Sequence, residues 1–285
     1  MPFNRFLSTI RRFGWKSFPE HQMDNNTFDA RYNLAPKAFR HWMDGKLDLT
    51  QSTILDFGTD TGVMALGLIQ HCKVKRLIGV DINENHKNLL LEIRGRLNFS
   101  TLPENLLFKY IEPDEPLSQT FADEIIDCIF SWSVFEHVNQ NLLPTAAREI
   151  AKTIRSSGYA FIQIAPLYYS AFGSHMDMLI PQPWSHLTTQ LNLYQNQILQ
   201  AKKNTLYAEE TDENFEKIKE AFWSVFATLN KITANELLDL FLGTGLNLIR
   251  QHRTKTAHIP PSELTAIYHE DVLTTEQIVC LFQKN

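Results

Sequence analysis

One stretch of this 285-residue chain combines glycines and acids in a pattern suited to binding a nucleotide. It follows an apolar run at 54–55, and its residues are Asp56, Phe57, Gly58, Thr59, Asp60, Thr61 and Gly62. Glycines in such a loop let the backbone approach a ligand closely. Further along, Asp81 ends a second apolar run, where its carboxylate can accept hydrogen bonds from two ribose hydroxyls. The combination predicts a nucleotide site in a doubly wound sheet.

Asp60 departs from this pattern, because it stands where such loops normally have their middle glycine. Aspartate adopts the left-handed backbone conformation more readily than most other non-glycine residues, so the turn can be kept. Its carboxylate could pair with a cationic group of the ligand or crowd an anionic one. Whether the protein is an enzyme depends largely on this position.

Three residues that could move a proton follow the fourth and fifth predicted strands. His175 comes after the turn 172–174 and is the first candidate for a general base, although it could instead form hydrogen bonds within its own segment. Glu136 and His137 follow the fourth strand. They could transfer a proton, or they could shape the pocket and order the helix that comes next.

Four ring-bearing residues are candidates for binding an acceptor molecule, since sugars often stack on such rings. Aromatic residues that follow a strand are nonetheless more often used in packing. They are Tyr168, Tyr169, Trp184 and His186. The ten histidines show no short ligand spacing, so no metal site is expected.

The elements that must position these residues alternate between strand and helix. This alternation predicts an α/β fold, a Rossmann-like, doubly wound and mostly parallel sheet of seven strands with helices on both faces. We expect strands at 54–57, 76–81, 106–111, 125–132, 159–165, 246–253 and 278–282. We expect helices at 63–71, 85–98, 143–154 and 234–242.

The alternation predicts how the chain is divided. Residues 1–50 are expected to form an N-terminal helical lid segment, and residues 51–285 the main domain. Between 166 and 231 the simple alternation is lost and the sequence becomes long and helical. We expect this part to be a helical cap insertion at the C-terminal edge of the sheet, where open α/β sheets bind ligands.

Bulk composition narrows the class of protein. With 44% hydrophobic residues the chain can bury a sizeable core, and a net charge of −5 gives no electrostatic reason to bind nucleic acid. Three widely separated cysteines make no closed disulfide framework, so the cytoplasm is the expected compartment. No run is long and apolar enough for a transmembrane segment.

Residues 1–18 are basic and aromatic, with no acid among them. They could form an interfacial helix that makes peripheral membrane contact, a transit peptide, or a helix that packs its aromatic side chains over the nucleotide cleft. We favour the last, because one short segment rarely anchors a protein stably. Nothing in the sequence indicates the oligomeric state.

Four elements, in order, resemble the class I S-adenosylmethionine (SAM)-dependent methyltransferases with a type 11-like, small-molecule domain. The resemblance covers about residues 53–165. Its elements are the loop 56–62, the acid Asp81, the segment 127–138 and the turn 155–159. The resemblance implies SAM as cofactor. It implies cofactor-binding roles for Asp56, Phe57, Gly58, Asp60, Gly62, Asp81, Ile82, Asp114, Ser131 and Trp132.

Charge agrees with this resemblance. SAM carries a sulfonium and an ammonium group, whereas the pyrophosphate of a dinucleotide would be repelled by Asp56 and Asp60 together. We therefore expect Asp60 to weaken SAM binding without abolishing it. A nicotinamide-dependent oxidoreductase is a distant third possibility.

The leading hypothesis is a SAM-dependent methyltransferase that acts on a small-molecule or saccharide acceptor, at oxygen. The saccharide preference rests on an analogy between segments 166–175 and 183–186 and methyltransferase-like proteins of bacterial surface-polysaccharide pathways. The alternative is a catalytically silent binding or scaffold protein that keeps the fold. The sequence lacks the Asn-Pro-Pro-Tyr and Asp-Pro-Pro-Tyr motifs of nucleic-acid base methyltransferases, and segment 166–231 lacks a basic cluster with interleaved aromatics, so nucleic acid is not expected as a partner.

Overall fold

A computed structural model describes residues 23–205, 207–208 and 210–285 of the chain. The interpretation of residues 1–18 as a lid, membrane or transit segment therefore lies outside the described residues. Within these described ranges, no helix combines the length and apolar character needed to cross a bilayer.

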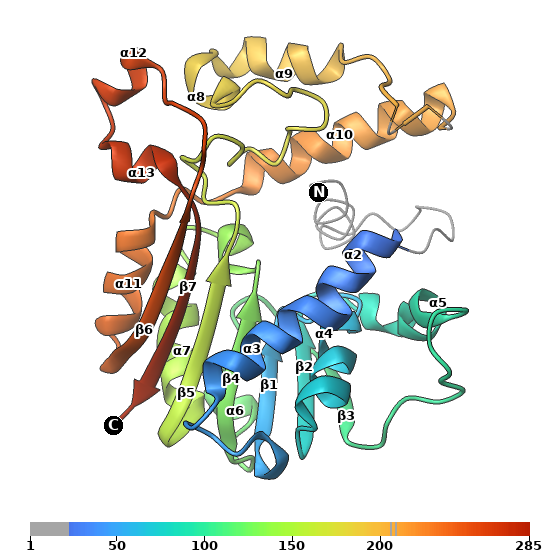
Figure 1. The fold of residues 1–285 in the computed structure, drawn as a ribbon, viewed down its shortest axis with the longest axis vertical. Helices are drawn as coiled ribbons and strands as arrows, with labels where there is room; N and C mark the ends of the chain where they lie inside the picture. The colour runs from blue at the N-terminus through green and yellow to red at the C-terminus, as the bar shows by residue number, and fades with distance from the viewer. Residues whose placement is uncertain (1–22, 206, 209) are drawn as a thin grey trace.

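Seven strands form one sheet in the order β3-β2-β1-β4-β5-β7-β6 (Figure 1). Neighbouring strands run parallel from β3 to β5, while β7 lies antiparallel between β5 and β6. The predicted doubly wound, mostly parallel α/β sheet is confirmed. The strands are β1 (Thr53–Phe57), β2 (Arg76–Asp81), β3 (Leu106–Tyr110), β4 (Ile126–Trp132), β5 (Ile154–Ile164), β6 (Leu246–Lys255) and β7 (Thr275–Lys284).

Helices cover both faces of the sheet because apolar side chains of the central strands alternate between two core clusters. One face carries α2 (Asn25–Asp29), the π-helical turn η1 (Ala30–Leu34), α3 (Ala35–Met43), α4 (Val63–Gly67), the π-helical turn η3 (Leu68–Cys72) and α5 (Leu89–Ile93). The other carries α6 (Leu117–Thr120), α7 (Leu143–Thr153) and α11 (Ala234–Leu242). Three 3₁₀ turns complete this part, η2 (Leu49–Gln51), η4 (Asn85–Asn88) and η5 (Phe135–His137).

The segment before the sheet packs directly on α4. Gly67 makes this possible, because a Cβ there would lie 2.3 Å from the carbonyl oxygen of Tyr32. The side chains of Phe39 and Trp42 meet the ring of Phe161 edge-on, at 5.3 and 5.6 Å between centroids. The N-terminal helices are therefore part of the core on this face.

Two expected elements differ most from those observed. The helix expected over 85–98 is a 3₁₀ turn followed by α5, which ends at Ile93 because Gly95 adopts a left-handed backbone with φ of 73°. Strand β5 begins at Ile154 rather than 159. The turn expected at 156–158 is present as a bulge within it, with Ser157 at φ 61° and a shift in register against β4.

Residues 166–231 lie above the carboxyl ends of the strands, as Figure 1 shows. They contain α8 (Ser185–Thr188), α9 (Leu191–Leu199) and α10 (Asp212–Thr228), and α10 begins where the Thr211 side chain accepts a hydrogen bond from the backbone N–H of Asn214. Helices α9 and α10 bury an apolar cluster of their own. We call residues 166–231 the cap. The predicted division of the chain into a lid segment, residues 1–50, and a main domain, residues 51–285, stays a prediction.

A second excursion joins β6 to β7 beside the cap. It carries α12 (Ser262–Thr265) and α13 (Glu270–Thr274). Leu264 and Leu273 from these helices pack with Ala171 and Trp184 of the cap in a small apolar cluster. The base of the cap is thereby tied to the antiparallel end of the sheet.

Candidate active site

The loop between β1 and α4 turns sharply through three left-handed residues. Gly58, Asp60 and Gly62 have φ values of 82°, 51° and 80°. The N–H groups of Gly58 and Thr59 both donate to the carbonyl oxygen of Val80, at 2.8 and 3.0 Å. This ties the loop to the end of β2, which brings the glycines and Asp81 together as the sequence pattern predicts.

Asp60 is a buried and bonded member of this loop. Its Oδ2 lies 2.8 Å from Nη1 of Arg31 in η1, and its Oδ1 accepts a hydrogen bond from Nδ2 of Asn85 at 2.8 Å. The carboxylate is therefore bonded to a cation and an amide of the protein. The sequence anticipated the left-handed turn here, but neither Arg31 nor Asn85.

Asp81 links the loop to the cavity. Its Oδ2 accepts a hydrogen bond from the N–H of Asp60 at 2.8 Å, and its Oδ1 accepts from Nδ2 of Asn83 at 2.8 Å. Each carboxylate oxygen can accept more than one hydrogen bond. Oδ1 also accepts from the backbone N–H of Asn83 at 3.2 Å, so both oxygens are held in place at the edge of the cavity.

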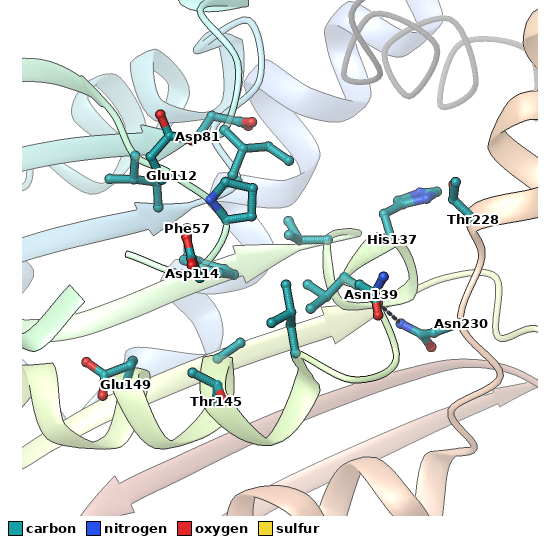
Figure 2. A pocket seen from close by; sticks show the side chains of 18 of the residues that line it. Phe57, Asp81, Glu112, Asp114, His137, Asn139, Thr145, Glu149, Thr228 and Asn230 are labelled. Atoms are coloured by element: carbon teal, nitrogen blue, oxygen red, sulfur yellow. Dashed lines mark hydrogen bonds between the residues drawn. The ribbon is translucent and has the colours of Figure 1, made fainter. Parts of the chain in front are cut away.

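A cavity of about 720 Å³ opens from Asp81 across the carboxyl ends of β1 and β4. This volume falls within the roughly 300–1,000 Å³ of ordinary ligand sites. Figure 2 shows Asp81, Glu112 and Asp114 on one side and His137, Thr228 and Asn230 on the other. Of the residues predicted from sequence, those that line it are Phe57, Gly58, Asp81, Ile82, Asp114 and His137.

Gly58 has no room for a side chain at the wall of this cavity. A Cβ on Gly58 would lie 2.4 Å from Cγ2 of Val134, which also lines the cavity. The loop after β1 and the loop after β4 therefore meet across a glycine. Any larger residue would displace Val134.

The other predicted cofactor residues do not line the cavity. Asp56 and Ser131 are buried within β1 and β4, and Trp132 stacks on Phe130 with ring centroids 6.1 Å apart. Gly62 starts α4. Their cofactor-binding roles stay predictions.

The predicted proton-transfer residues come together. The rings of His137 and His175 are 5.2 Å apart between centroids, inclined by 52°. His137 lies in the short turn η5 after β4, and His175 lies in the cap at φ 61° and is 7% exposed. Glu136 is buried next to His137. Two segments far apart in sequence thus place an imidazole pair beside the cavity.

The predicted acceptor-binding aromatics take packing positions in the cap. Trp184 is 1% exposed and donates from Nε1 to the carbonyl oxygen of Tyr169 at 3.1 Å. Nε2 of His186 lies 2.7 Å from the carbonyl oxygen of Tyr168, and burial lowers the pKa of His186 to about 4. Burial likewise raises the pKa of Tyr168 to about 12. None of the four lines the cavity, and their role in acceptor binding stays a prediction.

Sequence reasoning missed the polar wall opposite Asp81. It comes from the start of α7, the loop before it, and the end of the cap. Its side chains include Asn139, Gln140, Thr145, Thr228, Asn230 and Lys231. A local sequence pattern could not reveal this wall, because its two halves lie far apart in the chain. Asn230, for example, is 92 residues from its hydrogen-bond partner Val138.

Residues 21–251 match a protein family described as a methyltransferase domain. Among solved structures, a Galdieria sulphuraria protein assigned as a sarcosine dimethylglycine methyltransferase is similar, with 14% identity, a TM-score of 0.52 and coverage of 99% of this chain and 98% of that one. A geranyl diphosphate methyltransferase, solved with GPP and sinefungin, matches with 10% identity, a TM-score of 0.50 and coverage of 88% and 77%. No curated protein matches the sequence.

The two structures are similar in fold alone, whereas the family match spans most of the chain. The sheet order, the glycine loop and the strand-terminal acid Asp81 fit that family. The chain belongs to the class I SAM-dependent methyltransferases.

Proposed function

We propose that this protein transfers a methyl group from SAM to an oxygen of a small polar acceptor, a saccharide being the preferred class. The observation that carries the proposal is one cavity with the Asp81 carboxylate at one side and the imidazole of His137 at the other. A site for a nucleoside and a group that can take up a proton thus share one space.

The residues present suit a bound SAM. Asp81 offers carboxylate oxygens for the ribose, Ile82 and Pro113 offer apolar surface for the adenine ring, and Asp114 can accept a hydrogen bond from the adenine amino group. The absence of a side chain at Gly58 leaves the backbone open to close approach. The chemistry of this donor set therefore fits the cofactor.

The environment of Asp60 favours an active enzyme over the silent alternative. Its carboxylate is bonded to Arg31 and Asn85, so the charge is compensated within the protein. A carboxylate held in this way does not need the ligand as its counter-ion. Its effect on the methionine carboxylate of SAM is accordingly expected to be small.

When bound, SAM would supply an electrophilic methyl group on its sulfonium centre. The protein's own contribution to such a displacement is to orient the acceptor, exclude water and remove a proton. An imidazole nitrogen of His137 would take up the proton of the acceptor hydroxyl as the oxygen forms its new bond to carbon. His175, in contact with His137 from the cap, would stabilise the resulting imidazolium by orienting it.

The wall around His137 supports a hydroxyl-rich acceptor. Asn139, Thr145 and Thr228 present amide and hydroxyl groups, which donate to and accept from sugar hydroxyls. The cytoplasm, where SAM is made available to such enzymes, is the proposed compartment.

Photo-crosslinking with tritiated SAM, followed by methyl transfer to a panel of free and nucleotide-linked sugars, tests the proposal. Labelling of the wild type and transfer to one sugar class are expected. His137→Ala and His175→Ala should keep labelling and lose most transfer, whereas the exposed His252→Ala should keep both. A wild type that does not label would establish the silent scaffold instead.

A further inference from the structure

We propose that Asn230 is a positioning residue that fixes His137 by clamping the loop after β4 to the end of the cap. Asn230 lies two residues beyond α10 and is 4% exposed. It lines the cavity beside Asn139, as Figure 2 shows. The inference rests on the proposed function only for the role given to His137.

Asn230 bonds to the backbone on both sides of His137. Its side-chain Nδ2 donates to the carbonyl oxygens of Phe135 and Val138, the latter at 2.8 Å. Its backbone N–H donates to the carbonyl oxygen of Glu136 at 3.1 Å. The carbonyls that flank His137 in the chain are therefore all held by one residue.

The orientation of this amide is determined by its partners. Oδ1 of Asn230 accepts a hydrogen bond from the N–H of Ile232 at 3.1 Å. Because an N–H can bond only to the oxygen of the amide, Nδ2 must face the loop. Aspartate at this position could accept from Ile232 but could not donate to either carbonyl.

Both ends of the cap meet at the same short loop. At the cap's beginning, the ring of His175 contacts the ring of His137. At its end, Asn230 holds residues 135–138, and the N–H of Lys231 donates to Oε1 of Gln140 at 3.0 Å. Movement of the cap therefore moves His137, so an acceptor that contacts the cap would change the position of the imidazole that takes up the proton.

Hydrogen exchange of the full chain, measured without ligand, tests the clamp through the amides of His137 and Val138. Asn230→Ala should speed their exchange by about thirtyfold, since it removes two hydrogen bonds to this loop and each contributes on the order of 1 kcal/mol. The matched control is Asn204→Ala, which removes another amide-to-carbonyl bond of the cap, to Met178. It should leave these amides within about twofold of the wild type.

The imidazole resonances of His137 give a second readout that a purely structural role would not move. We expect Asn230→Ala and Asn230→Asp to displace them and Asn204→Ala to leave them in place. Unchanged exchange and unchanged His137 resonances in a folded Asn230→Ala protein would overturn the inference.

Gln140→Ala decides the matter if the Asn230 variants do not fold. Gln140 is exposed, and its loss removes only the neighbouring bond to Lys231. Exchange of His137 and Val138 should then rise by about fivefold, and no rise would overturn the inference. Failure of the wild type to bind S-adenosylhomocysteine would refute the proposed function alone, because the exchange is measured without ligand.

Discussion

Replacing Arg31 by methionine tests whether Asp60 is held in the glycine loop as one half of a buried ion pair. Nη1 of Arg31 lies 2.8 Å from Oδ2 of Asp60, with side-chain exposures of 12% and 2%. Removing one partner of such a pair typically costs about 3–5 kcal/mol, because the remaining charge stays in a poorly solvated place. Since Arg31 is slightly exposed and Asn85 still bonds to Asp60, we expect a loss of about 3 kcal/mol.

Asp60→Gly should cost less than Arg31→Met. Glycine adopts φ of 51° without the roughly 1–2 kcal/mol that left-handed backbone costs other residues, which offsets part of the lost ion pair. The double variant should be more stable than Arg31→Met alone, because the buried carboxylate is gone. The coupling energy of this cycle is expected to be on the order of 2 kcal/mol.

Urea unfolding followed by tryptophan fluorescence gives these free energies by linear extrapolation. Arg76→Met is the matched control, because its pair with Glu124 is more exposed, at 36% and 28%, and should contribute less than about 1 kcal/mol. Equal losses for Arg31→Met and Arg76→Met would refute the assignment of a buried pair. Calorimetry on the same proteins should show that SAM binds to both the wild type and Asp60→Gly, somewhat more tightly to the variant. Binding to the variant alone would mean that the natural protein is a catalytically silent member of the family.

Two further substitutions probe the cavity and the cap. Gly58→Ala should lower the free energy of unfolding by roughly 3 kcal/mol and weaken S-adenosylhomocysteine binding, because φ is 82° there and the added Cβ would collide with Val134. The control is Gly95→Ala, where φ is 73° but no atom lies within 4 Å of the added Cβ. It should cost only about 1 kcal/mol in the same unfolding assay. Equal costs would contradict the collision. Burial lowers the pKa of His186 from 6.5 to about 4, so between these pH values His186 is protonated in the unfolded chain but not in the folded chain. The free energy of unfolding should therefore fall by up to roughly 3 kcal/mol as the pH is lowered from 6.5 to 4. Unfolding of His186→Gln should show a smaller dependence on pH, and an unchanged slope would exclude His186 as the cause.

The strands that carry the cofactor site could be predicted because their signals are local. Buried parallel strands form apolar runs, as in 54–55 and 77–80, and glycines and acids follow those runs where the chain turns. Asp81 and Gly58 could therefore be placed at one edge of the sheet. His137 and His175 could be nominated because each follows a predicted strand at that edge.

The remaining site residues depend on long-range packing. Arg31 precedes Asp60 by 29 residues, and no feature of its own helix indicates an ion pair with the glycine loop. Asn230 meets Val138 only because the cap leaves the sheet and returns to it. Ring side chains such as those of Trp184 and His186 suit both a pocket wall and a packed core, and a single sequence does not distinguish the two, so their role in acceptor binding stays a prediction.

Binding of a nucleoside cofactor at Asp81 is the central claim, and calorimetric titration with S-adenosylhomocysteine tests it most directly. The wild type should bind one molecule per chain, and the isosteric Asp81→Asn should bind at least about tenfold more weakly, since a hydrogen bond to a charged group contributes about 1.5–3 kcal/mol. The exposed Asp123→Asn should bind like the wild type. Absence of binding to the wild type, or equal affinity of the wild type and Asp81→Asn, would contradict the claim.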